Sequence, residues 1–240
     1  TALYGSRGLN GAVVITTKSG KKGKPKFNFS FNSGVNDRAV KPHSSFNTAQ
    51  WREYLTEGVK NAYGFDTNQQ AYDHVVSGQE GADMQNIFTS PHDTNWQKAV
   101  EKSGYQQNAD FNISGGNDKL TYYTSANYFL QESIIRNSDF NRLAFTQKIG
   151  YQATDKLKIN TDFQIAYSKM KTLTEGGTFA NPILAQYFNR PTDPIYNADG
   201  SYYWNSSSRL SNNMYNTVFL QRNNYSKANT LRAFANLGVE

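Results

Sequence analysis

Few side chains in this sequence have the types and spacings that catalysis or metal binding requires. The three histidines, His43, His74 and His92, are far apart, and no pair has the short spacing of a helical zinc motif. There is no cysteine, which excludes a disulfide framework and a thiolate metal site. No Ser/His/Asp arrangement, glycosidase carboxylate pair or phosphate-binding loop stands out. The sequence therefore predicts a protein that is not an enzyme and that holds no metal or other cofactor.

The first 20 residues combine regularly spaced glycines with one arginine. Gly5, Gly8 and Gly11 are three residues apart, and Arg7 and Asn10 lie between them. Glycines at this spacing allow tight turns and a close approach of backbones. The β-branched run 12–17 that follows predicts a buried strand. We interpret residues 1–20 as one compact unit.

The composition is unusual because a low mean hydropathy accompanies many aromatic residues. Mean hydropathy is -0.72, hydrophobic residues make up 37% of the chain and aromatic residues 14%. A disordered chain would be poor in aromatic residues. A helical membrane protein would contain runs of about 18 or more apolar residues, and this chain has none. A porin-type barrel satisfies both observations, because only alternate residues face lipid and aromatic residues form rings at both interfaces.

The net charge of +6 does not come from a single basic region. Basic chains often bind nucleic acid or anionic surfaces, but here lysine and arginine are scattered apart from the run 18–26. That run is either a patch for an anionic partner or a solvated linker. We interpret residues 21–26 as a linker and expect no nucleic-acid partner.

Six segments have the strict alternation of β-strands. Phenylalanines 27, 29 and 31 alternate with Asn28, Ser30 and Asn32, which is the period of a strand. The same pattern returns from residue 105, and tight-turn sequences lie at 115–118 and 154–156, with a polar reversal near 136–139. The remaining expected strands cover about 105–114, 120–131, 143–152, 157–167 and 225–239.

Two long segments interrupt the strands, at about 36–104 and 170–224. In the first, Asn47 with Gln50 three residues later predicts a capped helix, and a second short helix is expected over 68–76. Trp51 and Tyr54 are interpreted as the apolar face of the first helix. In the second segment, Asp199-Gly200 predicts a turn within an otherwise irregular loop.

Strand length and loop asymmetry together favour a membrane barrel. Most of the expected strands have about ten residues or more, whereas globular strands commonly have about 5–6. Both minimal turns fall at one end of the strands and both long loops at the other, which is the outer-membrane pattern. A soluble β-sandwich with polar outer faces is the alternative. About six strands cannot close a wide barrel, and residues 1–5 do not resemble a signal peptide. We therefore expect the chain to be part of a longer polypeptide.

The stretch 2–20, ALYGSRGLNGAVVITTKSG, resembles the end of the plug in the SusC/RagA family of TonB-dependent outer-membrane transporters. The family pattern is close to YGSRGANGVV followed by a hydrophobic residue and ITTK, and this chain departs from it mildly at Leu9 and Ala12. The resemblance continues more weakly at residues 95–97 and 112–123, which look like the family's early barrel strands.

The resemblance implies an all-β fold, a transmembrane antiparallel β-barrel of about 22 strands with about six present here. Residues 1–20 would be the C-terminal end of an internal plug domain, 21–26 a linker, and 27–240 the N-terminal part of the barrel. It also implies location in the bacterial outer membrane in contact with lipid, energy from the inner-membrane TonB complex and a SusD-like surface lipoprotein as partner. The cargo would be an oligosaccharide or peptide.

The same resemblance implies site residues, which remain expectations. The plug residues are Tyr4, Gly5, Ser6, Arg7, Gly8, Asn10 and Gly11. Arg7 either latches the plug to the barrel wall and takes part in gating, or is a static hydrogen-bonding centre of the plug. Tyr202, Tyr203 and Trp204 follow the turn at 199–200, and they either contact a ligand or lid protein or pack inside the loop.

Three functions stay open at this stage. TonB-dependent import of a large nutrient is the leading prediction. A siderophore or cobalamin receptor of the same class is the second, and the glycine-arginine motif and loop sizes count against it. An adhesin or structural barrel without transport is the third, and it gives no reason for a plug segment before the first strand.

Overall fold

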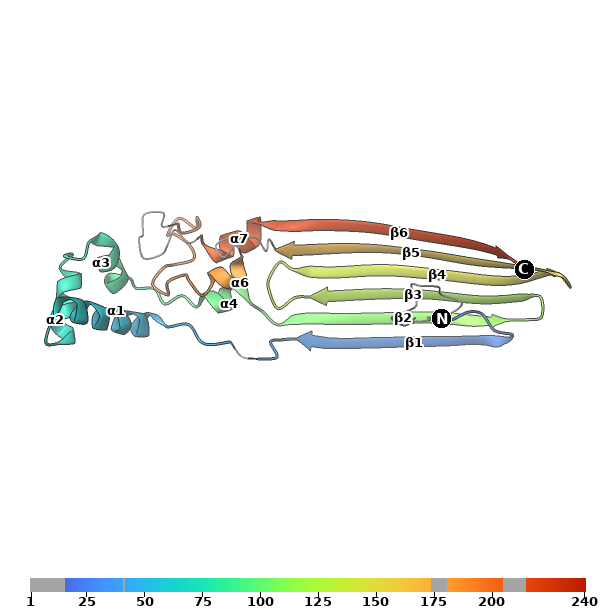
Figure 1. Ribbon diagram of the computed structural model, residues 1–240, viewed down its shortest axis with the longest axis horizontal. Helices are drawn as coiled ribbons and strands as arrows, with labels where there is room; N and C mark the ends of the chain where they lie inside the picture. The colour runs from blue at the N-terminus through green and yellow to red at the C-terminus, as the bar shows by residue number, and fades with distance from the viewer. Residues whose placement is uncertain (1–15, 41, 174–180, 205–214) are drawn as a thin grey trace, which may run out of the picture.

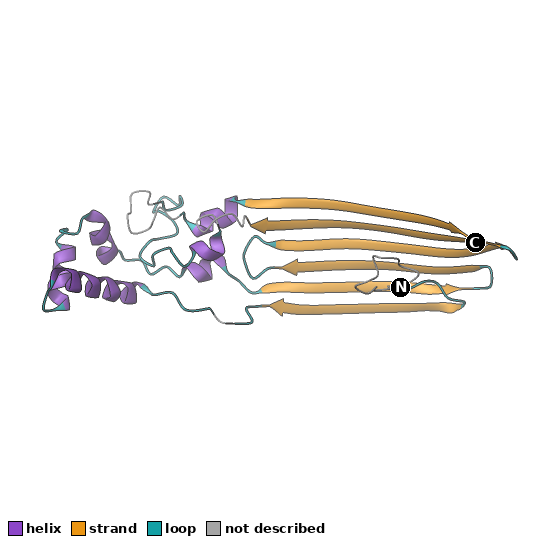
Figure 2. Ribbon diagram, in the orientation of Figure 1, coloured by secondary structure: helices purple, strands orange, loops and turns teal. Residues whose placement is uncertain are grey.

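A computed structural model describes residues 16–40, 42–173, 181–204 and 215–240. Six long strands form one antiparallel sheet in which every strand pairs with its neighbours in the sequence, in the order β1-β2-β3-β4-β5-β6 (Figures 1 and 2). Their bounds are β1 Gly23–Asn36, β2 Gly104–Gly116, β3 Leu120–Glu132, β4 Asp139–Thr154, β5 Leu157–Leu173 and β6 Tyr225–Val239. All six predicted strands are confirmed, and each has 13 to 17 residues.

The first strand begins earlier than the alternation suggests. β1 starts at Gly23, within the stretch interpreted as a linker, and Gly23 pairs with Gly116. The register shifts between Gly23 and Lys26, so the charged stretch enters the sheet through a bulge. Thr16 and Thr17, the end of the predicted buried strand, have no regular secondary structure. The rest of that predicted strand and the seven named plug residues lie outside the described residues.

The pairing register places the two sets of alternating residues on opposite faces of the sheet. In the antiparallel register, residues directly opposite one another point to the same side. Phe29, Phe111, Ala126, Phe145, Ile165 and Ala233 therefore form one row across all six strands. We call this side the apolar face. The opposite side carries Asn28, Asn112, Ser125, Thr146, Gln164 and their neighbours at even spacing, and we call it the polar face.

The apolar face is not covered by any other described part of the chain. Phe29 is 70% exposed, and Phe27 and Phe31 are also more than half exposed. The sheet is a single layer with the helices beyond one of its ends, rather than packed on a face (Figure 2). The soluble β-sandwich would enclose these phenylalanines in a globular core. In the described part of the chain they are not enclosed.

The helices of the described residues lie at the end of the sheet where the long loops leave it (Figure 1). They are α1 Thr48–Tyr63, α2 Asn68–Val76, α3 Ala82–Thr89, α4 Trp96–Val100, α6 Pro182–Ala185 and α7 Thr217–Asn223. The capping box of Asn47 and Gln50 is confirmed, as are the bounds of α2. α3, α4, α6 and α7 fall in stretches that were predicted only as loop. None of the described helices is long and apolar enough to cross a membrane.

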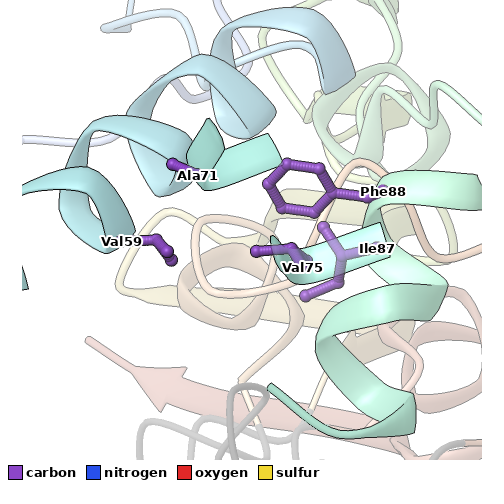
Figure 3. Close-up of a cluster of buried hydrophobic side chains, with 5 residues drawn as sticks. All are labelled: Val59, Ala71, Val75, Ile87 and Phe88. Carbon is purple, nitrogen blue, oxygen red and sulfur yellow. The ribbon is translucent and has the colours of Figure 1, made fainter. Parts of the chain in front are cut away.

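A buried apolar cluster lies in the first long loop and not in the sheet. Val59 of α1, Ala71 and Val75 of α2, and Ile87 and Phe88 of α3 pack together (Figure 3). Trp51 and Leu55 pack against this cluster, whereas Tyr54 is 61% exposed. The helix therefore buries the Trp51 side of its predicted apolar face and leaves Tyr54 open, stacked on Trp51.

Candidate functional site

The polar face carries two sets of cross-strand hydrogen bonds between side chains near the middle of the sheet. Asn127 of β3 donates to Asn108 Oδ1 and Asp110 Oδ1 of β2, each at 2.8 Å, and it accepts from Arg142 of β4 at 3.2 Å. Asn28 of β1 donates to Asn112 at 3.0 Å. These bonds join four strands on one side, because cross-strand neighbours on one face are close enough to interact. The polar face therefore presents hydrogen-bond donors and acceptors to solvent.

The segment before β1 lies against this polar face. Lys148 Nζ donates to Thr17 Oγ1 at 2.5 Å and pairs with Asp162 at 3.1 Å, and both charged side chains are largely covered. Gly20 approaches the backbone of β3 so closely that a Cβ would lie 2.7 Å from the carbonyl oxygen of Tyr122. Glycine is required at such an approach. Residues 16–20 therefore run along the polar face rather than the apolar one.

The two long loops form one unit above the sheet. Arg38 makes a bidentate ion pair with Glu101, with Nη2 to Oε1 at 2.5 Å, and Gln186 of the second loop donates to the same carboxylate at 3.0 Å. Burial opposes ionisation of Glu101, but hydrogen bonds from Arg38 and Gln186 outweigh it and hold the pKa of Glu101 below its ordinary value. The same pairing raises the pKa of Arg38.

A second junction surrounds a buried arginine of the second loop. Arg190 is 3% exposed and pairs with Asp193 at 3.0 Å and with Asp83 of α3 at 3.3 Å. Its carbonyl oxygen accepts from Trp96 Nε1 of α4 at 2.8 Å. Burial works against the charge of Arg190, but the two carboxylates outweigh it and raise its pKa. The sequence pattern did not identify Arg190, and its only local signal is the aspartate three residues later.

An aromatic cleft lies where the two loops meet. A cavity of about 310 Å³ is lined by Phe46 and Trp51 of the first loop and by Tyr187 and Phe188 of the second loop. His43 also lines it. Aromatic rings of this kind can stack on the apolar faces of a ligand. No local sequence pattern predicts this cleft, because about 135 residues separate its two halves. The described residues contain no group of three or more potential metal ligands.

The three aromatic residues predicted as a contact site are placed differently from one another. Tyr202 packs between Tyr196 and Phe219, with ring centroids 5.2 and 5.3 Å away, inside the second loop. Tyr203 is half-buried, and its carbonyl oxygen accepts from Asn216. Trp204 is 47% exposed and packs on Tyr215. Trp204 is therefore the member most available to a partner.

The curated relatives that match this chain are named as TonB-dependent receptors. The chain is 29% identical over 97% of its length to TonB-dependent receptor P3 of Formosa agariphila, and 31% identical over 84% to TonB-dependent receptor P26 of the same organism. It is 27% identical over 88% to the TonB-dependent receptor SusC of Bacteroides thetaiotaomicron. The chain spans 21%, 18% and 19% of these three proteins, respectively. It matches no family model.

Solved structures show the same fold. The RagAB peptide transporter aligns with 70% of this chain at a TM-score of 0.53 and 22% identity, and the chain covers 20% of that chain. The 'open-open' state of the RagAB peptide importer gives a TM-score of 0.53 at 23% identity, covering 71% of this chain and 20% of that one. These comparisons confirm the resemblance to the SusC/RagA family of TonB-dependent receptors.

The six-stranded antiparallel sheet and its likeness to the solved transporter chains confirm the predicted fold class, an all-β chain with the antiparallel strands of a transporter barrel. The resemblance also agrees with the prediction that the chain is not an enzyme, since its SusC-type relatives are receptors. The exact plug boundary and the roles of the plug and loop residues stay predictions. What the structure adds to the family resemblance is the side of the sheet along which residues 16–20 run.

Proposed function

We propose that this chain is part of a TonB-dependent importer in the bacterial outer membrane, which brings in an oligosaccharide or peptide. The observation that carries the proposal is the two-faced sheet: its apolar face is open, and residues 16–20 lie on its polar face. A membrane barrel with an internal plug needs this arrangement, because lipid requires an apolar outer side and the plug occupies the polar lumen. The names of the relatives support TonB dependence.

The proposed domain division follows from the same arrangement. Residues 1–20 form the end of the plug, 21–26 lead out of it, and 27–240 supply the first strands of a barrel of about 22 strands. The bulge after Gly23 gives the chain a place to turn from the lumen into the wall. Arg7 remains the proposed latch between plug and wall.

We place the partner proteins at opposite ends of the sheet. A SusD-like lipoprotein would rest on the loop unit, where Trp204 and the aromatic cleft are accessible. The long loops all leave the sheet at this end, as extracellular loops do in outer-membrane barrels. TonB would act from the end with the minimal turns.

A TonB-dependence experiment tests the function. Cells that express the complete receptor are given a pool of labelled oligosaccharides and a pool of labelled peptides, with and without a working TonB. We expect uptake from one pool to require both the receptor and TonB. Equal uptake without TonB would support a passive channel instead. If neither pool is taken up but a labelled siderophore or cobalamin is, the siderophore or cobalamin receptor class would be favoured.

A cross-linking experiment tests the domain division independently of cargo. The chain has no cysteine, so Thr17→Cys with Lys148→Cys gives one unambiguous pair on the polar face. Thr17→Cys with Ile149→Cys is the matched control, because Ile149 lies on the apolar face beside Lys148. A short bismaleimide should join the first pair and not the second. Equal yields would contradict a plug end inside the lumen.

A further inference from the structure

Charged residues on the apolar face occur at only one end of the strands. Within the regular register of the six strands, this face carries five charged side chains, and all five lie toward the end of the sheet where the long loops leave it. They are Glu132, Asp139, Lys169, Lys171 and Lys227. Toward the minimal turns the same face stays uncharged in this register, as with Ile159, Leu237 and Val239. The charge therefore marks one boundary of the apolar surface.

Three lysines concentrate at the β5–β6 side of this boundary. The last apolar row contains Leu143, Tyr167 and Leu231, which are opposite one another in the register. One row further toward the loops on this face is Lys169, and the next row pairs Lys171 with Lys227. The structure thus places three ammonium groups on neighbouring positions of two paired strands.

Tyrosine rings orient the three ammonium groups. Lys171 Nζ lies 4.3 Å and Lys227 Nζ 5.1 Å from the ring centre of Tyr225, and Lys169 Nζ lies 5.6 Å from the ring centre of Tyr167. Rings at this distance attract a cation while leaving it open to other partners. Lysine and tyrosine together at the end of an apolar surface are typical of a membrane interface, where both present an apolar body and a polar tip.

The lysines do not have acidic partners of their own in the described part of the chain. Glu132 pairs with Lys102 at 2.5 Å. Asp139 is opposite Lys171 in the register but forms no ion pair among the described residues. Lys171 Nζ donates to the amide oxygen of Asn137 at 3.3 Å. Among the described residues, the cluster therefore keeps a positive charge that one neighbouring carboxylate, Asp139, opposes.

The height of the apolar surface places this charge at headgroup level. Ten residues separate Leu157 from Tyr167, which is roughly 33 Å along a strand at about 3.3 Å per residue. A strand tilt of about 40° reduces that to about 25 Å, the height of the outward apolar band of outer-membrane barrels. The three ammonium groups then lie just above the hydrocarbon, on the side of the long loops.

We propose that Lys169, Lys171 and Lys227 form a binding site for the phosphate groups of anionic lipid headgroups in the outer leaflet. The proposal rests on the proposed membrane location. Charge complementarity and continuity with the apolar face favour a lipid over a soluble partner, since the acyl chains of a lipid would cover the rows below while its phosphates meet the ammonium groups.

The test compares lipid selectivity of the complete receptor reconstituted in vesicles. The probes are spin-labelled phosphatidic acid and spin-labelled phosphatidylcholine, and the measurement is their relative association with the protein. Each basic residue near an anionic lipid surface strengthens binding by about fivefold. We therefore expect phosphatidic acid to be favoured over phosphatidylcholine by at least about tenfold. The variant K169Q/K171Q/K227Q should lose most of this preference, and K169R/K171R/K227R should keep it.

The matched control removes equal charge from the polar face. K26Q/K158Q/R232Q changes three basic residues that the register places on that side, and it should keep the preference. No preference in the unaltered receptor, or equal loss in both glutamine variants, would overturn the proposal. A site that binds soluble inorganic phosphate but shows no lipid preference would also overturn the proposal. So would a K169Q/K171Q/K227Q variant that loses a lipoprotein partner while its lipid selectivity is unchanged.

Insertion is read separately, by protection of the strands from protease in the vesicles. A receptor that does not insert contradicts the proposed function as well as the lipid site. A receptor that inserts but shows no lipid preference contradicts the lipid site alone.

Discussion

At the scale of residues, the contact between the two loops includes a few buried polar groups beside the apolar ones. Trp96 is buried between the loops, and its indole donates to the carbonyl oxygen of Arg190. Trp51 is half-buried and its indole nitrogen has no partner among the described residues. The two tryptophans thus differ in whether the indole makes a hydrogen bond between the loops.

Trp96→Phe is expected to destabilise the loop unit by about 0.5–1.5 kcal/mol, because the buried carbonyl oxygen of Arg190 loses one of its donors and keeps the backbone N–H of Asp193. Trp51→Phe is the control, since it makes the same change of ring without loss of a hydrogen bond. Hydrogen exchange of the amides in α4 measures the opening free energy of the unit. Equal effects of the two substitutions would mean that ring packing, and not the hydrogen bond, holds the loops together.

At the scale of elements, the strands were predictable and several helices were not. Alternation such as Phe27-Asn28-Phe29 is a local property, so each strand could be found without knowledge of its partner. α1 was predictable for a similar reason, because Asn47 and Gln50 form its cap within four residues. α4 and α6, of five and four residues, have no such repeating pattern and are stabilised by contacts with the other loop.

The two faces of β5 predict opposite responses to a charge. Ile165→Arg places a guanidinium on the apolar face in the row that contains Phe145 and Ala233, and we expect it to cost about 2–4 kcal/mol of folding free energy in lipid. Ala166→Arg, one position further, points to the polar face and should cost less than about 1 kcal/mol. Urea unfolding of the complete receptor in vesicles measures both. Similar costs for the two substitutions would contradict a lipid environment on the apolar face and an aqueous one on the polar face.

At the scale of the whole molecule, the sheet and the loop unit are stabilised in different ways. The sheet relies on continuous cross-strand pairing, whereas the loop unit relies on its apolar cluster and on ion pairs between the loops. The two parts should therefore respond differently to acid, since ion pairs help to join the two loops, whereas the strands are held by backbone pairing as well as by their own ion pairs.

Acid is expected to open the junction between the loops before it affects the strands. The folded pKa of Glu101 is below its ordinary value, so its ionisation stabilises the fold above pH 4.5, the ordinary pKa. That contribution is lost as pH falls below 4.5 and through the lowered pKa, when Arg38 and Gln186 lose a charged acceptor. Its hydrogen bonds correspond to about 1.5–3 kcal/mol.

Hydrogen exchange between neutral pH and pH 3 measures this, with α4 and α7 compared with β3 and β4. The variant E101Q should already exchange faster at neutral pH and should lose the pH dependence in this window. An unchanged pH profile in E101Q would assign the acid sensitivity to another group, with the Arg190 cluster the next to examine.

The sequence by itself determined the strands, their two faces, the short and long connections and the family resemblance. These follow from the period of the side chains and from turn residues, which act over a few positions. Only the tertiary structure decided which loop residues meet, as with Arg38, Glu101 and Gln186, and that residues 16–20 lie on the polar face. The physical reason is that such contacts join segments up to about 130 positions apart, and no local period encodes them.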